Sequence, residues 1–420
     1  MTAPLGPSKP VLRLAFVGLG QGLMRIFQNY PEVKTLPFDI VAGVDVDPDA
    51  VAKFTAELGI PGHTSFEDLC ADPGVDVLYI STPPELHKEQ AIAGLEAGKH
   101  VLVEKPMALD LADCEEMVAT ADRTGYKLMV AHTHSLDLPV LKMAEIVASK
   151  TLGELHNIHT WNFNDFNARP FPTSTLRVSH GPLLEQAPHQ IDIVRKIARR
   201  PATSVTAATF NDSWRGCVGG FTSLIRFGPD VAASVAFDAR GFFDTSELFW
   251  WVGEGGEARD PETNTKARRH LRRRFAEAGD DPVLRERALE QEKKQDSYNR
   301  PALAARTGRT DNASAAPAKG AKNQPFFGLT IVDCADGAIR QSPNGLRLYR
   351  EDGVEEIPLE PALRGRAAEL MQMYDAVVHG ADLVHDGRWG MATLEICFAM
   401  LSSSRESREV PLTRQVLTSL

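Results

Sequence analysis

The stretch VLRLAFVGLGQGLMRIFQNY, residues 11–30, gives the clearest indication of the fold. Its apolar start predicts a buried strand, and a glycine-rich turn and a helical pattern follow directly. In a dinucleotide-binding fold the first glycine of such a turn permits the tight bend, and the second lets the backbone approach a pyrophosphate at the helix N-terminus. The expected cofactor contacts in this turn are Gly18, Gly20, Gln21 and Gly22. Leu23 stands where a GxGxxG motif has its third glycine, so we expect somewhat different packing of the helix on the strand.

Short apolar runs and helical patterns alternate through the first 135 residues. Further strand candidates are FDIVAGVD, VDVLYIST, KHVLVEK and YKLMVAH. Strands that are apolar along their whole length and alternate with helices predict a parallel sheet covered on both faces. We therefore expect residues 1–135 to form an α/β, Rossmann-like dinucleotide-binding domain.

The pattern changes after His134. Helices are expected in LPVLKMAEIVASK and HQIDIVRKIARR, and two more, roughly 361–379 and 389–404, close the chain. The strand candidates are HNIHTWNFND, TSVTAATF, FTSLIRFG, VAASVAFDA, ELFWWVG, GLTIVDC, LRLYR and VEEIPL. Because most of them follow one another without helices between them, they predict a large, mostly antiparallel open sheet. Residues 136–420 are expected to form an α+β domain for substrate binding and oligomerisation.

A charged, alanine-rich stretch, residues 253–325, interrupts this strand series. Its first half contains KARRHLRRRFAEAG and predicts a solvated helix, and its second half predicts a flexible loop. Acidic residues flank the basic cluster Arg272, Arg273 and Arg274, so a solvated face is a better interpretation than a nucleic-acid contact.

Composition narrows the class of protein. The 420 residues suit two domains, and 43% hydrophobic and 24% charged residues are ordinary for a globular protein. No apolar run reaches about 18 residues, and the N-terminus lacks a signal-peptide pattern, so we expect a cytoplasmic protein without a membrane partner. A net charge of -10 argues against nucleic acid as a partner. The five cysteines lie far apart without metal-ligand spacing, so we expect buried thiols and no metal site.

A carboxylate follows the second expected strand. Asp45 lies 25 residues after Gly20, where it can accept hydrogen bonds from the adenosine ribose and repel a 2′-phosphate. This position favours NAD over NADP as the cofactor. The alternative is that Asp45 only starts the following helix, although Asp47, beside Pro48, is the better N-cap.

The third expected strand ends in STPPELH, residues 81–87. Two prolines cannot continue a ladder, so the chain turns at the carboxyl end of the sheet, where open α/β folds bind ligands. The residues expected near the cofactor here are Ser81, Thr82, Pro83 and His87. Capping of the next helix is an equally good interpretation of His87.

The run LVEKPMALD, residues 102–110, places a charged pair at another strand end of this sheet. A lysine near the positive charge of a nicotinamide can have its pKa lowered and exchange a proton with a substrate hydroxyl. Lys105 is therefore a candidate catalytic residue, and Glu104 is expected to contact the cofactor or to orient the lysine. The alternative for Lys105 is a structural ion pair with a surface carboxylate.

A second cluster, LLEQAPHQIDIV, contains Glu185, His189 and Asp192. Glu185 and His189 are four residues apart, so on a helical turn they would share one face. A histidine can take a proton near neutral pH, and a carboxylate can set its tautomer and orientation. The alternative is a structural contact between the two side chains.

The motifs GLGQG, STPPELH, LVEKPMA and the His189 segment, in this order and spacing, resemble those of the Gfo/Idh/MocA oxidoreductases. AHTHSLDLPVL, TWNFNDFNARP and EQAPHQIDIVRKI are similar to proteins identified as phthalate 4,5-dihydrodiol dehydrogenases. The resemblance implies catalytic roles for Lys105, His189 and Glu185, and a homodimer or homotetramer. Three features depart from the family pattern: Glu185 replaces a usual aspartate, Ala187 a usual glycine, and His180-Gly181-Pro182 a run of glycines.

The resemblance also implies the reaction, which is hydride transfer between NAD(P) and a CH–OH group. The expected substrate is a cis-dihydrodiol of an aromatic carboxylate, with His189 as base and Lys105 as electrostatic partner. The expected substrate contacts are His134, Trp161, Arg169, His180 and Asp192, with Arg177 as a further cation. For the cations a surface ion pair is an equally good interpretation, and Trp161 alternates like a strand core residue. The rivals are a sugar, glycoside or cyclitol dehydrogenase of the same family and a non-catalytic NAD(P)-binding sensor or accessory protein.

Overall fold

Six parallel strands form the first sheet of the protein. The computed structural model describes residues 10–20, 35–169, 180–297, 323–360, 363 and 365–417. The strands are β1 (Leu12–Val17), β2 (Phe38–Val44), β3 (Gly62–His63), β4 (Val77–Ile80), β5 (His100–Val103) and β6 (Leu128–Val130). Their order is β3-β2-β1-β4-β5-β6, and each neighbouring pair is parallel. The predicted Rossmann-like sheet is confirmed, and its order reverses between β1 and β4, where such sheets bind their ligands.

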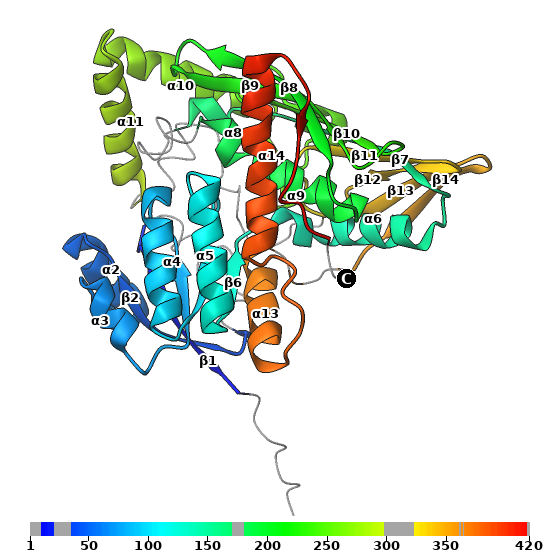
Figure 1. Ribbon diagram of the computed structural model, residues 1–420. Coiled ribbons are helices and arrows are strands. Elements are labelled where there is room, and N and C mark those ends of the chain that lie inside the picture. The colour runs from blue at the N-terminus through cyan, green and yellow to red at the C-terminus, as the bar shows by residue number, and fades with distance from the viewer. Residues whose placement is uncertain are drawn as a thin grey trace, which may run out of the picture. The chain divides into compact units, whose positions relative to one another are not determined.

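Helices cover both faces of this sheet, which explains its fully apolar strands (Figure 1). The helices of this part are α2 (Pro48–Leu58), α3 (Phe66–Ala71), α4 (His87–Glu96), α5 (Leu111–Thr124) and α13 (Gly365–Val378). On the α4 face, a Cβ atom at Gly94 would lie 2.7 Å from Leu78, so the helix approaches β4 closely because it has a glycine there. The side chain of Asp47 accepts from the amide of Asp49 and caps α2, as predicted.

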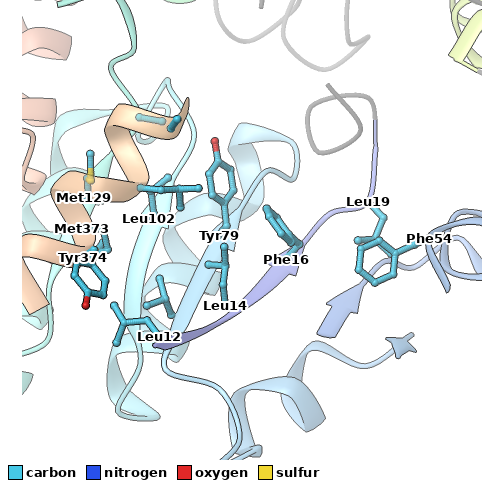
Figure 2. Close-up of a cluster of buried hydrophobic side chains, with 14 residues drawn as sticks. Leu12, Leu14, Phe16, Leu19, Phe54, Tyr79, Leu102, Met129, Met373 and Tyr374 are labelled. Atoms are coloured by element: carbon cyan, nitrogen blue, oxygen red, sulfur yellow. The ribbon is translucent and has the colours of Figure 1, made fainter. Parts of the chain in front are cut away.

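The opposite face packs against α13, which comes from the far end of the chain. Figure 2 shows Met373 and Tyr374 of α13 in one cluster with Leu12, Leu102 and Met129. Burying such side chains stabilises a fold by about 1.5–3 kcal/mol each. The sequence predicted this helix but gave no sign that it returns to the first sheet.

The chain divides into two compact units. The first contains residues 1–131 and 366–387, and the second contains residues 132–365 and 388–418. The domain limits 1–135 and 136–420 stay a prediction. None of the described helices has the length and apolarity needed to cross a membrane.

A nine-stranded sheet forms the second unit. Its strands are β7 (Leu155–Phe163), β8 (Ser204–Asp212), β9 (Cys217–Arg226), β10 (Ala232–Asp238), β11 (Leu329–Cys334), β12 (Gly337–Gln341), β13 (Gly345–Arg350), β14 (Gly353–Pro358) and β15 (Val410–Pro411). Their order is β14-β13-β12-β11-β7-β10-β9-β8-β15, and β7 and β10 form the one parallel pair in this sheet as described. The predicted mostly antiparallel sheet is confirmed, although β12 was not among the expected strands.

One face of this sheet is packed and the other is open. The helices of the unit are α6 (Leu138–Ser149), α8 (Pro182–Glu185), α9 (Ala187–Ala198), α10 (Thr263–Ala278), α11 (Pro282–Ser297) and α14 (Gly387–Glu406). Gln190 of α9 donates to the Thr160 hydroxyl of β7 and to the Ala236 carbonyl of β10, so α9 lies directly on the packed face. Figure 1 shows α6 and α9 on the same side of the sheet.

Two expectations about this unit need correction. ELFWWVG does not form a strand: Thr245–Phe249 is a 3-10 turn, η5, and Trp250 and Trp251 take positive φ angles of 60° and 53°. The Asp244 carboxylate accepts from the amide of Ser246 and fixes this turn locally, which outweighs the strand preference of the aromatic residues.

The second correction concerns the interrupting stretch. The expected helix exists as α10, but it is not solvated on all sides, because Ala267, Leu271 and Phe275 pack against Leu289 of α11 and Ala168. Their spacing of four residues is that of a buried helix stripe. The expected flexible loop lies mostly outside the described residues.

Candidate functional site

The glycine turn after β1 is fixed to the end of β4. Gly18 has a φ of +89°, and a Cβ atom there would lie 3.0 Å from the Ser81 carbonyl group, so glycine is required for both conformation and space. The Ser81 hydroxyl donates to the Gly18 carbonyl over 2.8 Å. A Cβ atom at Gly20 would meet no described atom within 4 Å. Among the described residues, nothing fills the space beside this second glycine, where a dinucleotide phosphate would lie.

Asp45 joins this turn to the end of β2. Its Oδ2 accepts from the Leu19 amide over 2.7 Å, and its Oδ1 accepts from the Asp47 amide over 2.9 Å. The amides of described residues take two of the about four acceptor positions of this carboxylate, whose negative charge would repel a 2′-phosphate. These residues fit an adenine dinucleotide without a 2′-phosphate. Gln21 and Gly22, the other expected contacts of this turn, lie outside the described residues.

His87 connects the two loops that follow β4 and β5. Its Nδ1 lies 2.9 Å from the Pro106 carbonyl oxygen, and its Nε2 lies 2.9 Å from the Thr82 carbonyl oxygen. The side chain is 1% exposed and begins α4 without serving as its N-cap. Nearby, the Thr82 hydroxyl donates to Gln90 over 2.6 Å, and Pro83 precedes the short turn η2 (Pro84–Leu86). His87 therefore fixes the loop that carries Ser81, Thr82 and Pro83.

Glu104 lies in a network of buried charges at the end of β5. Its Oε1 accepts from the Tyr79 hydroxyl over 2.9 Å and from Arg366 of α13 over 2.5 Å. Arg366 also donates to Glu369 over 2.9 Å. Burial raises the pKa of Glu104, but Arg366, Lys105 and the Tyr79 hydroxyl more than offset this, so its pKa lies below the usual value. Burial raises the pKa of Tyr79 well above its usual value.

Lys105 follows Glu104 directly, at the carboxyl end of the parallel sheet. It is partly buried, and its peptide bond to Pro106 is cis. Ser81, Glu104 and Lys105 thus occupy the ends of the adjacent strands β4 and β5, as the sequence predicted. Such ends face the ligand-binding side of an open α/β sheet.

In the second unit, Glu185 and His189 do not share a continuous helix. Glu185 ends α8, the chain bends at Gln186, and His189 lies in the first turn of α9. The reason is Pro188, which has no amide hydrogen to donate to the carbonyl four residues earlier and whose ring clashes with that carbonyl. The prediction that Glu185 and His189 share one helical turn is therefore wrong. The two residues lie on either side of the bend at Gln186.

His189 belongs to an aromatic cluster with His134. The ring centroids of the two histidines are 5.0 Å apart, edge to face, and both rings contact Phe327, at 4.3 Å from His134 and 4.9 Å from His189. The Nδ1 of His134 lies 3.1 Å from Asp137. Asp137 is the N-cap residue of α6, yet its side chain makes no capping bond and contacts His134 instead. The second unit thus brings together two of the predicted site residues.

Asp192, three residues after His189, lies deeper in the unit. Its Oδ1 accepts from the indole nitrogen of Trp389 in α14 over 2.6 Å, and the residue is 0% exposed. Arg195 stacks on the same indole ring at 3.5 Å. These contacts connect α9 to α14, and a substrate contact of Asp192 stays a prediction.

Three other expected substrate contacts, Trp161, Arg169 and His180, are also described in this unit. Trp161 is 41% exposed and lies on the face of β7 opposite Thr160, which contacts α9. Arg169 pairs with the fully buried Asp165 over 3.1 Å. His180 has a lowered pKa because it is partly buried and close to Arg405. Arg177 lies outside the described residues.

Three residues that contact the predicted site residues were not predicted from the sequence. Arg366, Tyr79 and Asp137 each contact a predicted site residue. Of these three, only Asp137 could have been found from the sequence. It stands just before a helix and three residues after a histidine, so its carboxylate can either cap the helix or contact the histidine. Tyr79 lies in an apolar strand and Arg366 in one of the last two helices. Neither position has a sequence pattern that indicates a contact with a site residue.

Comparison with known proteins identifies the family. Residues 12–132 match the GFO_IDH_MocA model, an oxidoreductase family with an NAD-binding Rossmann fold, and residues 140–259 match the Gfo/Idh/MocA C-terminal domain. The chain is 31% identical over 400 residues to a 1-carboxy-3-chloro-3,4-dihydroxycyclohexa-1,5-diene dehydrogenase of Comamonas testosteroni, covering 94% of this chain and 95% of that protein.

Two further similarities extend the comparison. A myo-inositol 2-dehydrogenase of Thermotoga maritima is 28% identical over 199 residues, covering 47% of this chain and 58% of that protein. A Bordetella bronchiseptica RB50 protein of known structure, described as a dehydrogenase, is 28% identical with a TM-score of 0.80, covering 96% of this chain and all of that one. The chain therefore belongs to the Gfo/Idh/MocA family of oxidoreductases and is an NAD(P)-dependent dehydrogenase whose residues 12–132 form the NAD-binding domain.

Proposed function

We propose that the protein oxidises a CH–OH group of a cis-dihydrodiol that carries a ring carboxylate, with NAD as the oxidant. The observation that carries this proposal is the similarity to the Comamonas testosteroni dehydrogenase over 94% of this chain. That protein is named for a ring with one carboxyl group and two adjacent hydroxyl groups. Because the similarity spans both units, it includes the segments around His134 and His189 as well as the cofactor domain.

We assign the CH–OH group to His189 and Lys105. His189 takes the hydroxyl proton as general base, and the Lys105 ammonium group stabilises the negative charge that develops on the oxygen. When bound, NAD would supply the acceptor for the hydride from the same carbon. Glu185 orients His189, and Phe327 supports the ring from the side at 4.9 Å. Gly18, Gly20 and Asp45 hold the adenine dinucleotide.

A ring carboxylate requires a cationic side chain to bind it, and we assign this role to Arg169. Its guanidinium group pairs with Asp165 through one nitrogen, whereas its buried Nε has no hydrogen-bond partner among the described residues. A guanidinium group has five N–H donors, so it can bind a second carboxylate in addition to Asp165. His134 is another candidate and Arg177 adds a further cation from the sequence, whereas the lowered pKa of His180 disfavours its cationic form.

A cyclitol is the second candidate substrate. The similarity to the myo-inositol 2-dehydrogenase favours it, although that similarity covers 47% of this chain. The two candidates differ in the fate of the product. Oxidation of a dihydrodiol gives a ketone that tautomerises to an aromatic diol, which drives the reaction forward, whereas an inosose stays a ketone.

A substrate panel separates the candidates. The purified protein is mixed with NAD or NADP and with 1-carboxy-3,4-dihydroxycyclohexa-1,5-diene, the same diol without the carboxyl group, or myo-inositol, and NAD(P)H fluorescence is followed. We expect the highest kcat/KM for the carboxylated dihydrodiol with NAD, and a reaction that runs to completion. A higher kcat/KM for myo-inositol would replace the proposal with the cyclitol alternative, and equal values for both diols would remove the role of Arg169.

We also propose that the protein is a homodimer or homotetramer in the cytoplasm. The open face of the large sheet carries exposed apolar side chains, including Trp161, Phe210 and Leu224. Exposed apolar clusters of this kind usually mark protein contacts. Light scattering on the purified protein gives the subunit count, and a monomer would contradict the proposal.

A further inference from the structure

We propose that Arg366 is a positioning residue for Lys105, because it binds the carboxylate of Glu104 and so controls the negative charge next to the lysine. The inference rests on the proposed role of Lys105 and deepens it. All the residues involved belong to the first unit. Arg366 comes from α13, so the return of this helix to the first sheet would have a consequence for the reaction as well as for packing.

The geometry commits the Glu104 carboxylate to Arg366. A single oxygen, Oε1, accepts from the Arg366 guanidinium over 2.5 Å and from the Tyr79 hydroxyl over 2.9 Å. Charge-assisted bonds of this length are stronger than neutral ones. Figure 2 shows the Tyr79 ring held among buried side chains, with its hydroxyl directed away from Leu14. Both donors are therefore fixed before any ligand arrives.

Glu369 holds Arg366 in turn. Its carboxylate is 0% exposed and accepts from Arg366 over 2.9 Å, one helical turn along α13. The charged and titratable groups that act on Glu104 among the described residues are Tyr79 of β4, Lys105 next in sequence, and Arg366 of α13, which Glu369 holds in turn. Arg366 is the cation shared by two carboxylates, so its loss would leave this network with excess negative charge.

The consequence for Lys105 follows from Coulomb's law. An opposite charge within about 4–6 Å of a titrating group shifts its pKa by roughly 1–3 units when burial reduces screening. With Arg366 present, the charge of Glu104 is compensated. Without it, Glu104 would attract the Lys105 ammonium group, raise the lysine pKa and compete with the substrate oxygen for its N–H donors.

A purely structural role of Arg366 is the alternative, and a double-mutant cycle separates the two. We would prepare Arg366→Gln, Glu104→Gln and the double variant of the full chain, and measure how fast acetic anhydride labels Lys105 as a function of pH, using peptide mass spectrometry. This measurement reports the lysine amine directly and requires no knowledge of the substrate. Lys142, a lysine on α6 whose side chain is 31% exposed, serves as the internal reference.

We expect Arg366→Gln to slow the labelling of Lys105 by about tenfold at a fixed pH below the lysine pKa, which corresponds to about one pKa unit. In the Glu104→Gln background the same change should alter labelling by less than about twofold, because the carboxylate next to the lysine in sequence is gone. An equal effect of Arg366→Gln in both backgrounds, or no effect in either, would overturn the inference.

Control variants test whether the effect on Lys105 labelling is specific to the Glu104–Arg366 contact. Arg13→Gln removes another arginine of the first unit, which pairs with Asp76 at the start of β1, and should leave Lys105 labelling unchanged. Arg366→Lys keeps the charge and should retain most of the wild-type labelling, which also covers the case in which Arg366→Gln fails to fold. Activity of Lys105→Ala is measured separately: near-native turnover would remove the proposed function, whereas an inactive Lys105→Ala with equal effects in both backgrounds would remove this inference alone.

Discussion

Asp45 fixes the glycine turn and has a proposed second role in cofactor binding, and a single substitution separates the two roles. Its carboxylate accepts from the Leu19 amide and so fixes the glycine turn, and we propose that it also accepts from the hydroxyl groups of the adenosine ribose. Asp45→Asn keeps a side-chain acceptor for Leu19 but removes the negative charge. Hydrogen bonds to charged groups contribute about 1.5–3 kcal/mol, so we expect NADH to bind roughly tenfold more weakly or worse.

The same substitution should favour the phosphorylated cofactor. Because the charge that repels a 2′-phosphate is gone, NADPH should bind at least as tightly as it does to the wild type. Fluorescence titration with both cofactors measures the ratio of the two Kd values. An unchanged ratio would show that Asp45 serves the turn alone.

Lys105 and Glu104 show how far individual site residues can be predicted from sequence. An apolar strand predicts its own end, so both residues were expected at the carboxyl edge of the sheet, where the structure has them. The partner of Glu104 was not predictable, because Arg366 lies in a helix whose sequence shows amphipathicity but not the sheet it covers. Pairing across a long sequence separation is decided by tertiary packing.

Helix α11 is joined to the turn between β8 and β9 by a buried ion pair of Arg215 with Glu286. Arg215 is 0% exposed and binds Glu286 of α11 through two contacts of 3.0 Å. It also donates to the carbonyl groups of Asn167 and Arg169. The charged stretch is therefore joined to the segment that carries Arg169.

Glu286→Gln tests this attachment. The change leaves the buried Arg215 guanidinium without a carboxylate, which costs about 3 kcal/mol when a buried pair is broken from one side. We expect the free energy of opening of α11, measured by amide hydrogen exchange, to fall by about this amount. Glu277→Gln is the matched control, because Glu277 is 54% exposed and pairs with Arg274 at the surface. Equal effects of the two substitutions would contradict the account.

Elements with a clear period were predicted correctly, and those governed by local backbone chemistry were not. The apolar strands β1, β2, β4 and β5 and the helices α6 and α9 lie where the periodicity placed them. ELFWWVG failed because the Asp244 side chain stabilises a turn there. The bend between Glu185 and His189 follows from Pro188, a signal that was present in the sequence but was outweighed by the spacing of four residues.

Each unit of the molecule supplies one part of the proposed chemistry. The first holds the glycine turn, Asp45 and the Glu104–Lys105 pair, and the second holds His189 with His134 and Phe327. Family membership makes the whole chain an NAD(P)-dependent dehydrogenase, whereas the alcohol it oxidises depends on a few side chains around these groups. A dihydrodiol carboxylate and a cyclitol place different demands on Arg169, so the substrate cannot be inferred from the fold.

The most direct test of the account is the kcat/KM for NAD-dependent oxidation of 1-carboxy-3,4-dihydroxycyclohexa-1,5-diene by the wild type, Lys105→Ala and His189→Ala. Loss of a positioned proton-transfer group lowers a rate by about 10²- to 10⁴-fold, so both variants should fall by at least about 100-fold while still binding NADH. Near-native turnover by both variants would contradict the assignment of Lys105 and His189 to the reacting CH–OH group.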